Sequence, residues 1–219
     1  MALTASDTGG GNFKRVPAGS HIARCFSVID CGTHTTNGQY GETTSRKIRL
    51  AWEIFGEDEN NEPLTVETGG IQLPMTINKT YTLSLGEKAS LRKDLSAWRG
   101  RDFNEEELKG FNISNVIGVY CMLNVTISES NGKTYSNVAG ISPLHKSMQK
   151  PAAVHKNQIF DLDNPDMEVF SSFHEKLQDY IKSSPEWSVY SKSTGKETVT
   201  NNKQPAGNFD DLEDDIPFN

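Results

Sequence analysis

The sequence predicts a mainly β domain of five strands with one helical insertion, followed by a C-terminal helix and a disordered acidic tail. Apolar and polar residues alternate before residue 85 and after residue 119, and between these regions apolar residues recur at helical spacing. Only 35% of the 219 residues are hydrophobic, and the mean hydropathy is -0.57. The chain is long enough for one domain with a core and an extension, and part of it is expected to stay solvated.

The first three strands are expected before residue 86. Residues 21–30 are rich in β-branched and aromatic side chains and are bounded by turn residues. In residues 46–55 the alternation is stricter, so one face belongs to the core and the other face is basic. Strand-like segments near residues 65–77 and 79–85 follow.

A helical insertion is expected after the third strand. Ser84 precedes Glu87 by three residues, which is the spacing of a capping box, and apolar residues follow at helical steps through Trp98. Asn104 is expected to cap a short second helix that Gly110 ends.

The last two strands are expected to form a hairpin. Residues 119–128 and 133–141 alternate in polarity, and Asn131-Gly132 between them predicts a type I′ turn. An order of three strands, a helix and two strands is that of a five-stranded OB-type barrel, with its helix between strands 3 and 4. An SH3-like barrel would lack so long a helix, and generic β-rich α+β packing is the alternative that stays open.

The region after the barrel is expected to contain one helix. Asn164-Pro165 is a plausible helix start, apolar residues from Phe170 to Ile181 recur at helical spacing, and Pro185 is expected to stop the helix. The helix could dock on the barrel or mediate assembly into a homo-oligomer. The predicted divisions are a flexible arm at residues 1–15, an OB-type domain at 16–156, a helical extension at 157–190, and a disordered linker with an acidic tip at 191–219.

Charge is distributed unevenly along the chain, whose formal net charge is -7. Residues 12–156 contain 17 Lys and Arg against 15 Asp and Glu, whereas residues 157–219 contain 5 against 13. Such an acidic end either imitates a polyanionic ligand of the body or only increases solubility, and the charge pattern leaves both readings open.

Several functional classes have little support in the sequence. No stretch is long and apolar enough for a membrane span, and no basic-then-apolar signal pattern occurs near the start, so a cytoplasmic location is expected. Cys25, Cys31 and Cys121 form no Cys-x-x-Cys pair, so we expect small buried side chains rather than disulfides or a zinc site. Because no metalloprotease, phosphate-loop or nucleophile-elbow motif is present, we expect no enzyme activity and no metal or cofactor. A metal-dependent nuclease is the weaker alternative.

The acidic tip carries a resemblance to a known family. The ending Asp214-Asp215-Ile216-Pro217-Phe218 places two apolar anchors beside two carboxylates after a polar linker. It resembles the tip of bacterial single-stranded-DNA-binding proteins, which implies recruitment of replication and repair proteins through these five residues. In that family the tip generally ends at the Phe, whereas Asn219 follows here.

Two further blocks, residues 80–111 and 131–144, are similar to phage-encoded proteins regarded as single-stranded-DNA-binding replication proteins. With the strands around them, the resemblance covers roughly residues 16–144. It implies sequence-tolerant binding and protection of single-stranded DNA during phage replication and recombination, in the cytoplasm of a bacterial host. An adaptor that acts only through its tip is the main alternative.

Binding of a single strand needs cations for the phosphates and exposed rings for the bases. The candidates lie on the outward face of the second strand, in the third and fifth strands, and in nearby loops or the N-terminal arm. They are Lys14, Arg15, Tyr40, Arg46, Lys47, Arg49, Lys79, Tyr81, Lys133 and Tyr135. A linker of about 18 residues spans roughly 23 Å, so the acidic tip is expected to reach and compete for this surface.

Overall fold

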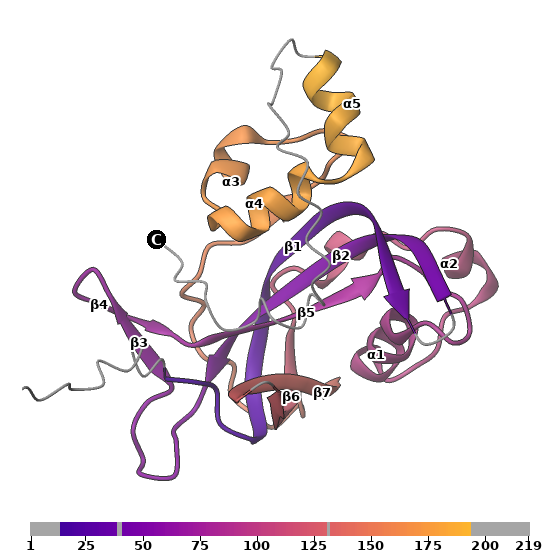
Figure 1. Cartoon of the computed structure of the whole chain (residues 1–219). Helices are drawn as coiled ribbons and strands as arrows, with labels where there is room; N and C mark the ends of the chain where they lie inside the picture. Colours follow the sequence, from indigo (N-terminus) through magenta and orange to yellow (C-terminus); the bar gives the residue numbers. More distant parts are fainter. Residues whose placement is uncertain (1–13, 39–40, 131, 194–219) are drawn as a thin grey trace, which may run out of the picture.

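The computed structural model describes residues 14–38, 41–130 and 132–193. The protein is mainly β, as predicted, and its largest sheet has the antiparallel order β5-β2-β1-β6-β7 (Figure 1). These strands are β1 (Gly19–Gly38), β2 (Gly41–Phe55), β5 (Thr76–Thr82), β6 (Tyr120–Ser130) and β7 (Lys133–Pro143). The hairpin of β6 and β7 is present as predicted, although Asn131 of its turn lies outside the described residues.

The main core lies on the inner face of this sheet. Leu50, Trp52 and Ile54 of β2 are buried, as their alternation predicts. Helix α1 (Ser90–Arg99) packs on the same core through Leu91, Leu95 and Trp98. All three cysteines are buried and free, and burial raises the pKa of Cys25 and Cys31 to about 12. These thiols therefore behave as small apolar side chains.

The two ends of the sheet approach each other without backbone pairing in the described residues. No ladder joins β5 to β7 there, so the sheet is not closed by hydrogen-bonded strands. A side chain bridges this seam, because Lys79 Nζ donates to the carbonyl of Val138 at 3.0 Å. The fold class is thus mainly β with an antiparallel sheet.

The helical insertion differs in detail from the prediction. Ser84 does not cap α1; its hydroxyl accepts from the amide of Gly86, and α1 begins at Ser90 after an N-cap without a side-chain hydrogen bond. Helix α2 (Glu105–Lys109) does carry the predicted cap, with Asn104 and Glu107 forming a reciprocal capping box. A short 3-10 turn, η1 (Ile113–Val116), leads into β6.

A second, small sheet interrupts the chain between β2 and β5. The strand expected near residues 65–77 is instead a hairpin of β3 (Thr65–Thr68) and β4 (Ile71–Pro74). Gly69 and Gly70 form its turn with φ values of 58° and 80°, which non-glycine residues rarely adopt. Figure 1 shows this hairpin projecting to the left of the main sheet.

The C-terminal region forms a helical unit (residues 158–193) rather than one helix. It contains β8 (Gln158–Phe160), α3 (Met167–Ser171), α4 (Glu175–Lys182) and α5 (Pro185–Ser193). Asp166 and His174 cap α3 and α4, and Pro185 begins α5 instead of stopping a helix.

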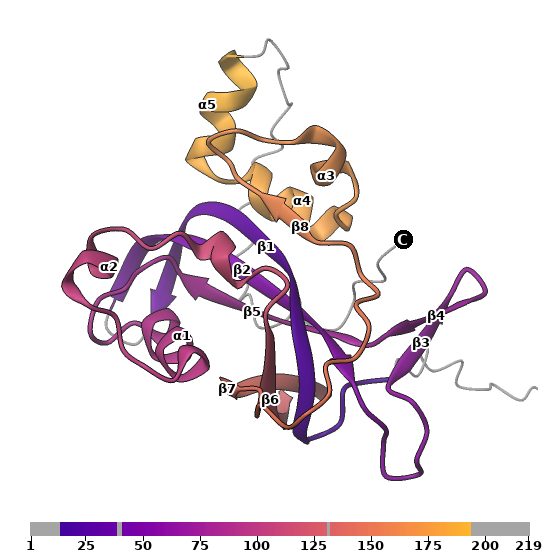
Figure 2. The same ribbon diagram turned by 180° about the vertical axis from the view of Figure 1, so that it is seen from behind.

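The helical unit is docked on the main sheet through β1. Strand β8 pairs in parallel with β1, and Ile29 and Cys31 of β1 belong to the unit's own core around Phe170 and Trp187. Figure 2 shows the strap (residues 144–157) running from β7 up the back of the sheet to β8. The predicted tip and most of the predicted arm and linker lie in residues 1–13 and 194–219, outside the described residues.

Candidate nucleic-acid interface

Lys47 is the predicted cation whose setting best suits a phosphate. It lies on the outward face of β2, opposite Thr82 of β5, and its Nζ donates to the Thr82 hydroxyl at 3.1 Å. The side chain is half-buried, and this burial lowers its pKa. Among the described residues, no carboxylate lies within ion-pair distance of Lys47. The site therefore holds a partly desolvated positive charge that an anion would stabilise.

Arg49 does not lie on an open basic surface, contrary to prediction. Its side chain is buried because the helical unit covers this part of the sheet. The positive charge of Arg49 acts on both Cys31 of β1 and Tyr180 of α4. The alternation in β2 correctly predicts two faces. At Arg49, however, the face turned away from the main core is also buried.

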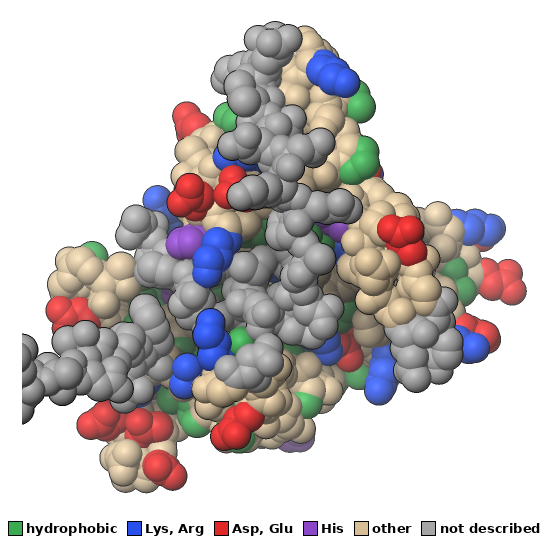
Figure 3. All heavy atoms as spheres, viewed as in Figure 1, with side chains coloured by type: hydrophobic (Ala, Val, Ile, Leu, Met, Phe, Trp, Pro, Cys, Tyr) green, Lys and Arg blue, Asp and Glu red, His purple; other side chains and the backbone are tan. Residues whose placement is uncertain are grey.

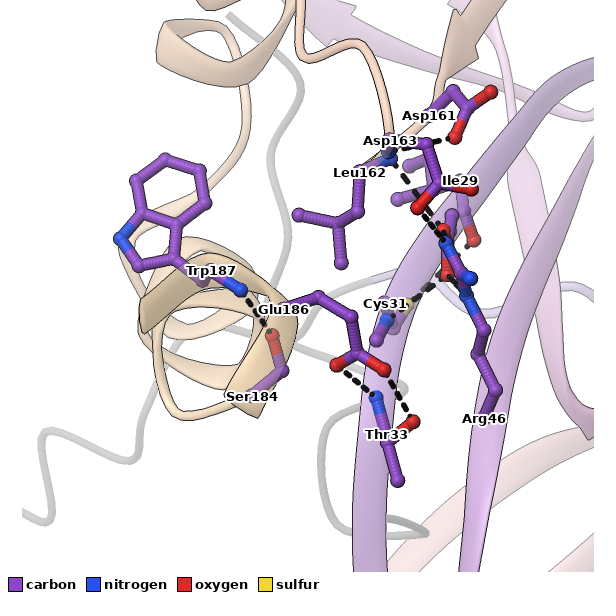
Figure 4. Close-up of polar contacts among 12 residues, drawn as sticks. Ile29, Cys31, Thr33, Arg46, Asp161, Leu162, Asp163, Ser184, Glu186 and Trp187 are labelled. Carbon is purple, nitrogen blue, oxygen red and sulfur yellow. Dashed lines mark hydrogen bonds and ion pairs between the residues drawn. The ribbon is translucent and has the colours of Figure 1, made fainter. Parts of the chain in front are cut away.

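Arg46 is already neutralised at the base of the β1–β2 hairpin. Its Nε lies 3.1 Å from both carboxylate oxygens of Asp30, and its Nη2 lies 3.1 Å from Asp163 of the helical unit. Figure 4 shows these contacts joining β2 to the segment after β8. A phosphate contact at Arg46 would have to replace one of these carboxylates.

Lys79 and Tyr81 point to the seam beside α1 rather than to solvent. The Tyr81 hydroxyl donates to Asp94 Oδ2 at 2.9 Å, and Lys79 Nζ donates to the same oxygen at 2.8 Å. Tyr81 is only 2% exposed, and burial is the main cause that raises its pKa. Tyr135 of β7 is buried as well, at 5% exposure. Neither ring is open to a nucleic-acid base, which corrects the prediction for both.

The remaining predicted contacts are spread over the surface. Lys133 is exposed beside the β6–β7 turn, and Arg15 is exposed before β1. Lys14 Nζ lies 3.6 Å from Asp58 and 3.7 Å from Glu62. Tyr40 is outside the described residues. Figure 3 shows Lys and Arg side chains at several separate places on this face.

A threonine-rich ribbon (residues 33–38 and 41–46) was not predicted. The expected strands ended at residue 30 and began at 46, but β1 and β2 continue as a two-stranded extension beyond the other strands. Thr35 and Thr44 share a hydrogen bond of 2.8 Å across it. The threonines in residues 33–44 are a sequence pattern that could have predicted this extension, because threonine is β-branched and favours strands. The ribbon runs toward α1 and α2 (Figure 1).

His34 at the ribbon base stacks on Tyr180 of α4, with ring centroids 3.6 Å apart. Burial, its largest influence, lowers the pKa of His34, and the charge of Lys47 acts in the same direction. The imidazole is therefore favoured in its neutral form. This stack ties the ribbon base to the helical unit.

The sequence analysis also did not predict a buried ion pair on the back of the sheet. Arg24 of β1 pairs with Glu53 of β2, and Glu53 is fully buried. The strap completes the group: His155 Nδ1 lies 3.0 Å from Glu53, and Asn157 accepts from Arg24 at 2.6 Å. These contacts hold the strap on the sheet, so the acids and bases here are structural.

The described residues contain neither a cluster of metal ligands nor a helix that could span a membrane. No group of three or more His, Cys, Asp or Glu side chains could hold a metal ion in that part of the chain. No helix within the described ranges is long and apolar enough to cross a membrane.

Comparison with known proteins adds no family assignment. No protein-family model matches the chain, and a search of the curated proteins finds no match. A functional interpretation therefore depends on the geometry of these residues and on the resemblance of the sequence blocks and the acidic tip.

Proposed function

We propose that this protein binds and protects single-stranded DNA through an OB-type barrel. The observation that carries the proposal is the strand order β5-β2-β1-β6-β7, with α1 between β5 and β6 in the chain. Numbered within the barrel, these are strands 3-2-1-4-5, which is the order of an OB fold opened between strands 3 and 5. In this proposal the Lys79 bridge and α1 cover the seam where the two end strands approach.

The fold suggests where DNA would lie. OB-type domains bind oligonucleotides on the face of strands 2 and 3, between the loop joining strands 1 and 2 and the loop joining strands 4 and 5. Here that face is formed by β2 and β5. The helical unit covers it at Arg49, and Lys47 and Thr82 lie on it beyond the covered part. The threonine-rich ribbon takes the place of the first loop, and the turn next to Lys133 takes the place of the second.

The chemistry of this face favours phosphate over base contacts. Lys47 offers a positive charge without a described acidic partner, and Lys133 is an exposed cation. Because Tyr81 and Tyr135 are buried, fewer rings remain for base stacking than the sequence predicts. Affinity is therefore expected to fall steeply with salt, with a slope of about 0.7 per phosphate contact on a logarithmic scale.

The biological setting is proposed from the resemblance alone. Residues 214–218 would recruit replication and repair proteins, and the acidic tip would occupy the basic face when DNA is absent. A phage-encoded protein working in a bacterial cytoplasm during replication and recombination fits this combination. These residues lie outside the described part of the chain.

The proposal is tested by fluorescence anisotropy with labelled oligothymidine over a salt series. Lys47→Ala should weaken binding at low salt and lower the salt slope by about 0.7, the value of one phosphate contact. Lys146→Ala is the matched control, because Lys146 is exposed and follows the end of β7 opposite to the β6–β7 turn. Equal effects of the two substitutions would refute the assigned face.

Absence of oligothymidine binding at low salt, by the full chain and by a chain without residues 210–219, would refute the function itself. That result would favour the adaptor. Gel analysis of the same oligonucleotide with Mg²⁺ tests the nuclease alternative, and we expect the oligonucleotide to stay intact.

A further inference from the structure

A carboxylate of the helical unit is bound at the base of the ribbon. Glu186 lies in the first turn of α5, and it accepts hydrogen bonds from both the backbone amide and the hydroxyl of Thr33. The amide bond is 2.9 Å long. Figure 4 shows the Glu186 side chain reaching from α5 to β1. Two donors of one residue thus converge on one anionic group.

The Thr33 amide is available because of its position at a strand edge. Strand β8 pairs with β1 only from Ser27 to Ile29, and the register of β1 shifts between Asp30 and Gly32. The amide of Gly32 is taken by Asp30 at 3.0 Å. Beyond this shift the Thr33 amide turns away from β2, and an edge amide needs an acceptor.

The surroundings of this contact favour a negative charge. Burial opposes ionisation of Glu186, but the hydrogen bonds from Thr33 and the charge of Arg46 outweigh it, so the pKa of Glu186 lies below its ordinary value. Arg46 stands directly opposite Thr33 in the ribbon. Asp30 and Asp163 balance Arg46, and His34 is the other titratable neighbour. This site thus stabilises a carboxylate even though Asp30 and Asp163 lie nearby.

We propose that the amide and hydroxyl of Thr33, beside the positive charge of Arg46, form a phosphate subsite at the ribbon base, which Glu186 fills in the absence of nucleic acid and from which a phosphodiester of single-stranded DNA displaces it. The inference rests on the proposed function, because it places the subsite next to Lys47 on the same ribbon base. Displacement frees the first turn of α5 from β1.

The test compares Glu186→Gln with Glu168→Gln in oligothymidine titrations of the full chain. Glutamine keeps the size and an acceptor oxygen at position 186 but removes the charge that competes with phosphate. We expect about fivefold tighter binding at low salt, at the lower end of usual coupling between sites. The salt slope should steepen by about 0.7, because the phosphate bound at this subsite no longer exchanges with a carboxylate that regains a counterion.

Glu168 is a matched control, because it is an exposed carboxylate in the first turn of α3 of the same unit. Its substitution should leave the slope unchanged. Adding Thr33→Val to Glu186→Gln should reduce the gain, since valine removes the hydroxyl donor but keeps the side-chain shape and the backbone amide. If Glu186→Gln and Glu168→Gln give the same slope while oligothymidine still binds, the subsite is refuted and the proposed function survives.

A second measurement does not depend on DNA binding. The amide resonance of Thr33 should shift and saturate with inorganic phosphate in Glu186→Gln, and it should need a higher phosphate concentration in the unsubstituted protein, where Glu186 competes. If it saturates while no form of the protein binds oligothymidine, the anion site stands and the proposed function fails. A Thr33 amide that ignores phosphate in Glu186→Gln overturns the inference.

Discussion

Replacing Asp94 tests whether the seam beside α1 is a structural bridge rather than part of a binding surface. Asp94→Ala would leave the Tyr81 hydroxyl buried without its acceptor, which costs about 2 kcal/mol. Lys79 would lose its ion pair but keep the Val138 carbonyl, and its side chain is 26% exposed. Solvent screening therefore limits that loss to about 1 kcal/mol, and the free energy of unfolding should fall by about 3 kcal/mol.

Equilibrium unfolding in urea measures this loss directly. Glu106→Ala is the control, because it removes a carboxylate that pairs with Lys109 on the surface of α2. We expect it to leave the unfolding free energy essentially unchanged. Tyr81→Phe should cost about 1.5 kcal/mol and leave oligothymidine binding unaltered. If Tyr81→Phe instead weakened binding and kept full stability, the burial argument for Tyr81 would be wrong.

Two other predictions concern the tail and pH. Deleting residues 210–219 should tighten oligothymidine binding at low salt and have no effect at high salt, because screening abolishes competition by the acidic tip; unchanged affinity across the salt series would reject that competition. For His34, burial lowers the pKa in the folded state, so protonation favours the unfolded chain, and stability should decline as the pH falls below about 6.5. His34→Phe keeps a ring on Tyr180 and should flatten that decline in urea unfolding between pH 7.5 and 5; an equal decline in both proteins would contradict the assignment.

The parts of the fold that depend on local sequence could be predicted. Ile48 and Leu50 alternate with Lys47 and Arg49, and the strand follows because the apolar side chains lie on the same face. The capping box of Asn104 and Glu107 forms within four residues, so distant contacts have little influence on it. These elements appear in the structure as expected.

The prediction that Ser84 begins a helix with a capping box was wrong, because a local turn forms there instead. The motif has the correct spacing, but Gly86 lies inside it, and the chain turns there with the Ser84 hydroxyl bound to the Gly86 amide. Spacing alone does not distinguish a helix start from a tight turn. The helix begins only at Ser90, after an N-cap residue, Ala89, whose side chain makes no cap hydrogen bond.

In the C-terminal region, apolar residues recur at helical spacing across the point where one helix ends and the next begins. Phe170, Phe173, Leu177 and Ile181 recur at helical steps because they all pack in one core. Yet the chain leaves the helix after Ser171, and His174 caps a new one. Periodicity reports which side chains face a core, whereas local capping decides where each helix ends.

The candidate site was harder to predict because outward does not mean exposed. Arg49 faces away from the main core, but a second core covers it, and no local pattern in β2 records which distant segment packs there. Lys79 lies two residues from both Ile77 and Tyr81 in β5, so the alternation of side chains along a strand predicts that all three face the same side. Its charge suggested solvent, and the acceptor that allows burial comes from α1, fifteen residues later.

Several of the predicted DNA-binding cations that the structure describes are already paired with carboxylates, which limits how a polyanion could bind. Arg46, Lys79 and Lys14 each have carboxylates within ion-pair distance, whereas no described carboxylate lies that close to Lys47. A phosphate that reaches Arg46 must therefore exchange with Asp30 or Asp163, and at Thr33 it must exchange with Glu186. Exchange of one anion for another gains little free energy from charge alone, since the cation is paired before and after. Net affinity would then come from Lys47 and from the counterions that DNA releases, so the Lys47 and Glu186 substitutions should change the salt slope in opposite directions.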